Sequence, residues 1–190
     1  MRYKEDHKEQ THKRIVETAS REFRIHGFDG IGIARLMALL QLTHGGFYSH
    51  FEGKEDLFEE AMSSSLDQSL NFMVQELKQG GIASLVHSYT DNLHRDNPGR
   101  GCPLPALSGE EARRPPGSRE SFTRKYDEIV ATIAGYVPGA TAEERMEKVL
   151  VMFAALSGAV SLARAVSDPA LSDRILRATR DHLIEYLSGE

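Results

Sequence analysis

Apolar residues in the first part of the chain recur at the spacing of an α-helix. Ile15, Ala19 and Phe23 lie four residues apart, and Val16 lies beside them. This stripe predicts an amphipathic helix over residues 5–26, which Gly27 ends as the residue after the C-cap. No stretch of the sequence alternates apolar and polar residues as a half-buried strand would, so we expect an all-helical protein.

Two short elements follow this helix. Residues 33–40 are apolar enough to form a short buried helix, and Gln41 and Leu42 then form a turn. Thr43 can cap a second short helix over residues 44–51, because its hydroxyl can accept a hydrogen bond from a free backbone N–H one turn later. Two short helices joined by a turn and braced by a longer helix indicate a helix-turn-helix.

The rest of the chain also shows helical patterns, and about nine helices are expected in all. Gly80-Gly81, Pro138-Gly139 and the Pro/Gly-rich loops around residues 97–105 and 114–117 separate them. Thr141 and Glu144 have the spacing of a capping box, and Asp168-Pro169 supplies an N-cap and a first-turn proline. The remaining helices are expected over residues 54–79, 82–96, 107–113, 118–136, 142–165 and 169–188.

Composition favours a cytoplasmic globular protein. The chain has 190 residues, of which 40% are hydrophobic and 27% charged, an ordinary balance for a globular fold. Cys102 is the only cysteine, which excludes an internal disulfide and fits a reducing compartment. Residues 149–166 are largely apolar but contain Arg164, so we expect a buried helix and no membrane partner. No secretory signal is visible.

Charge is distributed unevenly along the chain. The net charge is −5, yet residues 1–56 hold nine basic and nine acidic residues and five of the eight histidines. The excess of acidic residues therefore lies in the C-terminal part. This asymmetry permits DNA binding at the N-terminus without proving it.

The second short helix has the composition of a DNA-reading element. Gly45 and Gly46 weaken the helix by about 1 kcal/mol each relative to alanine, but they let the backbone approach DNA closely. Phe47 and Phe51 lie four apart and should face the core. Polar residues that can contact phosphates or base edges are Thr43, His44, Tyr48 and His50. Lys54 opens the next helix, whose N-terminus favours a phosphate.

Three segments together resemble the N-terminal signature of TetR-family regulators. They are Gly-Phe-Asp-Gly at 27–30, Leu-Thr-His-Gly-Gly-Phe-Tyr-Ser-His-Phe at 42–51 and Lys-Glu-Asp-Leu at 54–57. The resemblance spans residues 10–60, and the remainder fits the family only in helix number and order. It implies a helix-turn-helix DNA-binding domain over residues 1–55 and an effector-binding and dimerisation domain over residues 56–190.

The resemblance also implies roles for individual residues. Phosphate contacts would come from Thr43, Tyr48, His50 and Lys54, and His44 and Gly46 lie where the family touches base edges. The chain departs from the family at Ile31 and Gly32, where a threonine or serine pair is usual, and at Gln41, where glycine is usual. We expect a weaker helix cap at Gly32 and a turn conformation at Gln41 that glycine would adopt more easily.

The C-terminal part is expected to form a homodimer and to bind an effector. In the family the last two helices pair with those of a second subunit, and two reading helices match half-sites about 34–36 Å apart on a pseudo-palindromic operator. An unidentified small apolar effector would occupy a pocket; the alternative is a filled core. The candidate pocket residues are Met62, Phe72, Met73, Tyr89, Leu93, Phe122, Tyr126 and Met152.

Cys102 is a candidate sensor of electrophiles or oxidants. It lies on a predicted loop near Arg95 and Arg100, cations that would lower its pKa and favour the thiolate. Some TetR relatives place a sensing cysteine in this stretch; the alternative is an inert thiol.

We therefore expect a ligand-responsive transcriptional regulator, a repressor that its effector releases from the operator. An enzyme using Cys102 with His87 or His94 is disfavoured, because no catalytic or dinucleotide motif is present. A ligand-binding dimer that has lost DNA binding is a further alternative. No cofactor is expected, and the spacing of His7 and His12 does not indicate a metal site.

Overall fold

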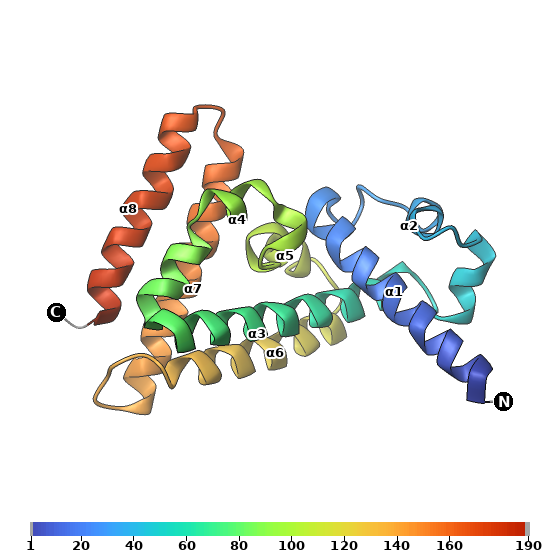
Figure 1. Cartoon of the computed structure of the whole chain (residues 1–190), viewed down its shortest axis with the longest axis horizontal. Helices are drawn as coiled ribbons and strands as arrows, with labels where there is room; N and C mark the ends of the chain where they lie inside the picture. Colours follow the sequence, from blue (N-terminus) through green and yellow to red (C-terminus); the bar gives the residue numbers. More distant parts are fainter. Residues whose placement is uncertain (1, 189–190) are drawn as a thin grey trace.

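The computed structural model describes residues 2–188, and these residues form α-helices and short 3-10 helices with no strand. This confirms the predicted all-α class. The helix-turn-helix lies at one end of the molecule, next to the N-terminus, and the last two helices lie at the other end (Figure 1). The elements are α1 Arg2–His26, α2 Ile33–Leu39, η1 His44–Ser49, α3 Lys54–Tyr89, α4 Asn92–Asp96, η2 Pro98–Arg100, α5 Leu104–Glu111, α6 Pro116–Ala134, α7 Ala142–Ala165 and α8 Pro169–Ser188.

Helix α1 forms because its apolar stripe is buried. Ile15, Ala19 and Phe23 are each at most 1% exposed, and the stripe packs against α3. The helix ends as expected: Gly27 adopts a φ of 74°, and its N–H donates to the carbonyl of Phe23 at 2.8 Å.

The two short helices are held by a strained turn. Gln41 has a φ of 59°, the left-handed conformation that the sequence predicted for it. Leu42 then donates its N–H back to the carbonyl of Met37 at 2.9 Å. Gly32 is the N-cap of α2 and provides no side-chain hydrogen bond, so the expected weak cap is also confirmed.

Helix α3 contains a kink near its C-terminal end, at the place where the sequence predicted a break. Gly80 and Gly81 leave helical geometry, Gly81 with a φ of 68°, so two helical segments, residues 54–79 and 82–89, meet there. This confirms the predicted break, but the second segment ends at Tyr89, short of the predicted helix over residues 82–96. Asp91 divides it, because its carboxylate accepts the N–H of Leu93 at 2.7 Å and so caps α4.

The C-terminal part is built from helix pairs. Helices α3 and α6 lie side by side, and α7 and α8 form an antiparallel hairpin (Figure 1). Both predicted caps are present. The Thr141 hydroxyl accepts the N–H of Glu144 at 3.1 Å, and the Asp168 carboxylate accepts the N–H of Ala170 at 2.9 Å.

Helix α7 is long and apolar enough to span a membrane by length and composition alone. In this fold one face of it is core: Val149, Met152, Phe153, Leu156 and Val160 are buried. Arg164 near its end donates to the carbonyls of His94 and Arg95 at 2.7 and 2.8 Å. The expected burial is therefore confirmed for one face only, because Leu150, Val151 and Leu162 on the rest of the helix are exposed.

Candidate nucleic-acid interface

The 3-10 helix η1 presents one apolar face inward and one polar face outward. Phe47 and Phe51 are buried, as predicted, and their rings stack at 5.4 Å between centroids. Tyr48 lies across the Phe47 ring at 5.2 Å and is itself 58% exposed. His44 is exposed, and its ring meets that of Tyr48 edge to face at 5.7 Å. Buried phenylalanines therefore support an exposed pair of hydrogen-bonding rings.

Thr43 and the two glycines shape the start of η1. The Thr43 hydroxyl accepts the N–H of Gly46 at 3.3 Å, which is the predicted capping bond. A Cβ at Gly45 would meet no atom within 4 Å, whereas one at Gly46 would lie 3.3 Å from the Thr43 hydroxyl. The backbone at Gly45 is therefore open to a partner, and Gly46 is more closely surrounded.

His50 is only half exposed. Its Nδ1 is buried and has no hydrogen-bond partner within the described residues, so only the other side of the ring can reach a ligand. Burial lowers the pKa of His50, and the nearby His12 and Lys8 lower it further. His12 in turn stacks on Phe51 at 4.5 Å and contacts the Glu60 carboxylate at 2.7 Å. Burial and these neighbours therefore disfavour the protonated form of His50.

Lys54 occupies the first turn of α3, as predicted, but it has a second contact. Its Nζ lies 4.3 Å from the centre of the Phe28 ring, and the Arg114 guanidinium lies 4.1 Å from the same ring. Lys54, the candidate for phosphate binding, is thus held beside the end of α1 by a cation–π contact.

The helix-turn-helix is joined to the C-terminal part by α5 and the residues after it. Glu110 of α5 accepts the N–H of Phe28 at 2.6 Å. Arg114 donates to both carboxylate oxygens of Glu55 on α3, at 2.9 and 3.1 Å. Sequence reasoning missed these residues, because nothing near Glu110 or Arg114 in the chain indicates which distant backbone they contact.

Comparison with known proteins agrees with this geometry. Residues 15–61 match the family model described as bacterial regulatory proteins, tetR family. Residues 15–61 therefore carry the N-terminal segment of the TetR family. The matched segment contains α2, η1 and the start of α3, which are the elements on which the sequence resemblance rested. The match favours a DNA-binding regulator over the alternative of an enzyme.

Relatives of known structure share the whole TetR-family fold. A TetR transcriptional regulator from Chloroflexus aurantiacus J-10-FL is 24% identical, with a TM-score of 0.77 over 99% of this chain and 97% of that one. The reduced form of Escherichia coli NemR is 18% identical, with a TM-score of 0.72 over 92% and 95%. A curated relative, the uncharacterised HTH-type transcriptional regulator YfiR of Bacillus subtilis (strain 168), is 24% identical over 88 residues, which span 46% of this chain and 43% of that protein.

The predicted pocket residues do not all lie together. Met62, Met73, Tyr89 and Met152 are buried in the C-terminal core, and Phe122 and Tyr126 are partly buried against it. Phe72 is 49% exposed and Leu93 76% exposed. The prediction that Phe72 and Leu93 line an interior pocket is wrong. Phe72 faces outward on α3, and Leu93 lies in the first turn of the short surface helix α4.

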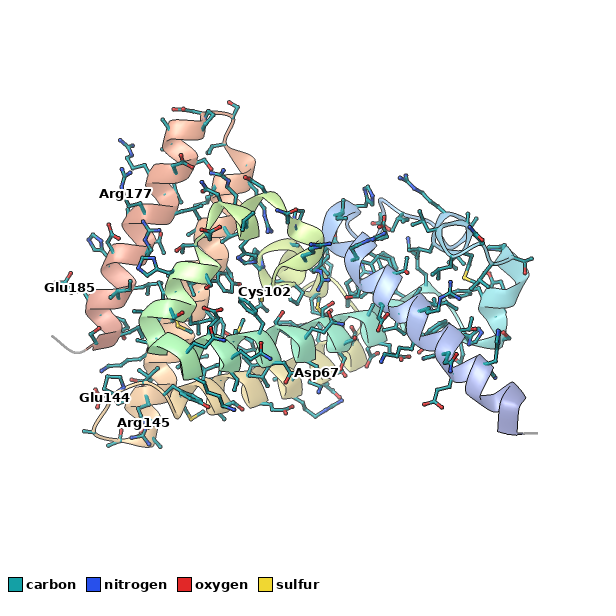
Figure 2. All side chains as sticks on the ribbon, viewed as in Figure 1. Asp67, Cys102, Glu144, Arg145, Arg177 and Glu185 are labelled. Carbon is teal, nitrogen blue, oxygen red and sulfur yellow. The ribbon has the colours of Figure 1, made fainter. Side chains whose placement is uncertain are left out.

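Cys102 lies in a different environment from the one predicted. It is buried inside the C-terminal part (Figure 2), and burial raises the pKa of its thiol despite the nearby Tyr89, Ser69 and Arg24. The expected lowering by Arg95 is therefore wrong, because Arg95 pairs with Asp96 and Asp173. The predicted lowering of the thiol pKa by Arg100 is also wrong, because the cation that acts on the thiol is Arg24.

Proposed function

We propose that the chain is a ligand-responsive transcriptional regulator that binds a pseudo-palindromic operator in double-stranded DNA. The observation that carries this proposal is the polar face of η1, where His44 and Tyr48 are exposed above a buried pair of phenylalanines. On this view Thr43, Tyr48, His50 and Lys54 contact phosphates, and His44 and Gly46 contact base edges. The protein acts in the cytoplasm as a repressor, and a small effector releases it.

The test is a duplex-binding titration followed by fluorescence anisotropy. DNA from the region upstream of the protein's own gene is compared with a scrambled duplex of equal length, across a series of salt concentrations. We expect saturable binding to both, tighter to the upstream DNA by a factor on the order of 10³ or more. Affinity for both should fall steeply with salt as phosphate contacts release counterions. Indifference to both duplexes at low salt would exclude DNA binding.

Dimerisation is proposed through α7 and α8. Helix α7 exposes a ridge at four-residue spacing that includes Met146, Leu150 and Leu162, and α8 exposes Tyr186. Exposed apolar residues in such a ridge are typical of a helix that packs on a partner.

Sedimentation of two leucine variants tests this dimer. Leu162→Glu on α7 should dissociate it, whereas Leu39→Glu, a change at a similarly exposed leucine of α2, should leave it intact. Equal sedimentation of the two variants would argue against this interface.

The effector site is proposed in the C-terminal core, around Met62, Met73, Tyr89 and Met152. These residues are buried, three of them on α3 and Met152 on α7, and methionine side chains adapt readily to a ligand. An effector shifts the equilibrium between DNA-binding and released forms only by its difference in affinity for the two. Native mass spectrometry of the purified dimer should detect a bound apolar molecule whose removal increases operator affinity.

The burial of Cys102 and the raised pKa of its thiol favour the inert alternative over a sensing role. N-ethylmaleimide should therefore leave both the wild-type protein and a Cys102→Ser variant bound to the operator. Release of the wild-type protein alone would show that the thiol senses electrophiles.

A further inference from the structure

Arg24 of α1 is a buried cation with no carboxylate partner among the described residues. Arg24 is 8% exposed, and its Nη2 donates to the carbonyl of Gly99 at 2.7 Å. Its Nε is buried and has no acceptor, and no ion pair forms at Arg24 within residues 2–188. Burial lowers the pKa of Arg24. A buried charge without a counter-charge is costly, so its retention calls for an explanation.

Arg24 lines an open cleft of about 910 Å³ between α1, α3 and η2. Arg100 of η2 and Arg21 of α1 lie in the same wall, and Ser64 and Gln68 of α3 add a hydroxyl and an amide. A cleft of this volume is large enough for a small organic ligand. The unpartnered guanidinium therefore borders space that a ligand can enter.

The charges along this cleft are separated. Glu9 lies fifteen residues before Arg24 on the same helix, which corresponds to about 22 Å. Glu17 is seven residues, or about 10 Å, from Arg24. The third carboxylate, that of Glu60, is held by His12 at 2.7 Å. The end of the cleft next to η2 is thus positive.

Two cations at this positive end remain available for a ligand. Arg21 is paired with the buried Glu22 at 2.8 Å. Arg100 is exposed and, like Arg24, forms no ion pair within the part of the chain that the structure describes. Arg24 of α1 contacts the carbonyl of Gly99, and Arg100 of η2 is the next residue along the chain.

We propose that the η2 end of this cleft binds a small oxyanion, a phosphate or carboxylate group, through Arg24 at its floor and Arg100 at its rim. Guanidinium groups donate in a planar geometry that matches such oxygens, and the bonds are charge-assisted. This site is separate from the effector site proposed in the C-terminal core. Because Arg24 belongs to α1 and Arg100 to η2, the bound anion ties the helix-turn-helix to the C-terminal part.

The experiment is calorimetric titration of the full-length protein with inorganic phosphate and, separately, with citrate, at constant ionic strength set by chloride. Arg100→Ala is the principal variant, since an exposed side chain can be removed without loss of fold. Arg24→Gln is the second, checked by circular dichroism. Arg124→Ala, which removes an exposed arginine of α6, is the matched control.

Saturable binding of either anion is expected for the wild-type protein and the Arg124→Ala control. Affinity should fall about tenfold or more in Arg100→Ala and Arg24→Gln, which corresponds to about 1.4 kcal/mol. Binding of phosphate alone, of citrate alone or of both supports the site and identifies the group it recognises. Equal affinities in wild type and Arg100→Ala, or no saturable heat with either anion, would overturn the proposal. DNA is absent from the assay, so the result is independent of the operator-binding test.

Discussion

The backbone N–H of Phe28 donates to Oε2 of Glu110 at 2.6 Å, joining residues that are 82 positions apart in the chain. The other oxygen of this carboxylate lies against Gly27, where a Cβ would overlap it. The C-terminal end of α1 is therefore anchored to α5. This bond is a physical link through which a change in the C-terminal part can reach the helix-turn-helix.

Removal of this link should destabilise the protein. In Glu110→Ala the Phe28 N–H loses its charged acceptor, so the free energy of unfolding should fall by about 1–3 kcal/mol. Urea unfolding measures the loss, and hydrogen exchange at the Phe28 amide should become faster. Glu120→Ala, at an exposed glutamate of α6, should change stability by no more than about 0.5 kcal/mol. Identical unfolding curves for the two variants would contradict the anchoring role.

Tyr48→Ala should weaken binding to all duplexes alike. A phosphate contact carries no sequence information, so specific and scrambled DNA should each lose about 1 kcal/mol of binding free energy. Stability should be unchanged, because the ring is mostly exposed. Tyr136→Ala, at an exposed tyrosine just after α6, is the control in the anisotropy titration. A loss confined to one base pair would show that Tyr48 reads sequence.

Gln41→Gly should stabilise the protein. The left-handed conformation at Gln41 costs a non-glycine residue roughly 1–2 kcal/mol. Glycine avoids this cost, but its larger conformational entropy in the unfolded state offsets part of the stabilisation. We expect a net increase of about 0.5–1 kcal/mol in the free energy of unfolding by urea. Gln75→Gly, in the exposed interior of α3, should instead lower it by about 1 kcal/mol. A lower stability of Gln41→Gly would show that its side chain contributes more than the turn costs.

The buried His94 should make stability depend on pH. Its Nδ1 donates to the carbonyl of Tyr89 at 2.6 Å and its Nε2 accepts the N–H of Cys102 at 3.0 Å, so the ring is neutral. Burial lowers the pKa of His94 below its usual value of about 6.5. Below that pH the unfolded chain binds a proton that the folded state excludes, and the free energy of unfolding falls as pH decreases.

Urea unfolding at pH values on either side of about 6.5 tests this dependence. Wild type should lose stability on acidification, and His94→Gln should lose less, because glutamine can accept the Cys102 N–H without titrating. His87→Gln, at an exposed histidine of α3, should retain the wild-type dependence. The same acid loss in His94→Gln as in wild type would exclude His94 as the cause.

The helix-turn-helix could be predicted because its signals are local. The Thr43 cap reaches only three residues, and Gly27 ends α1 through a hydrogen bond to Phe23. Gln41 adopts the left-handed conformation of the turn itself. The break at Gly80-Gly81 was predicted for the same reason, since both glycines leave helical geometry and Gly81 adopts a φ of 68°. The start of α4 was not predicted, although its signal, the cap by the Asp91 carboxylate, is also local.

The sequence alone determined the helical class, the predicted caps and the residues of the polar face of η1, since backbone conformation depends on neighbours within about four positions. Only the tertiary structure decided that Cys102 is buried, that Leu93 is exposed, and that Arg24 meets Gly99 from 75 positions away. Burial and pairing across such distances depend on how whole helices pack, and no local pattern of residues encodes which side chains then face each other.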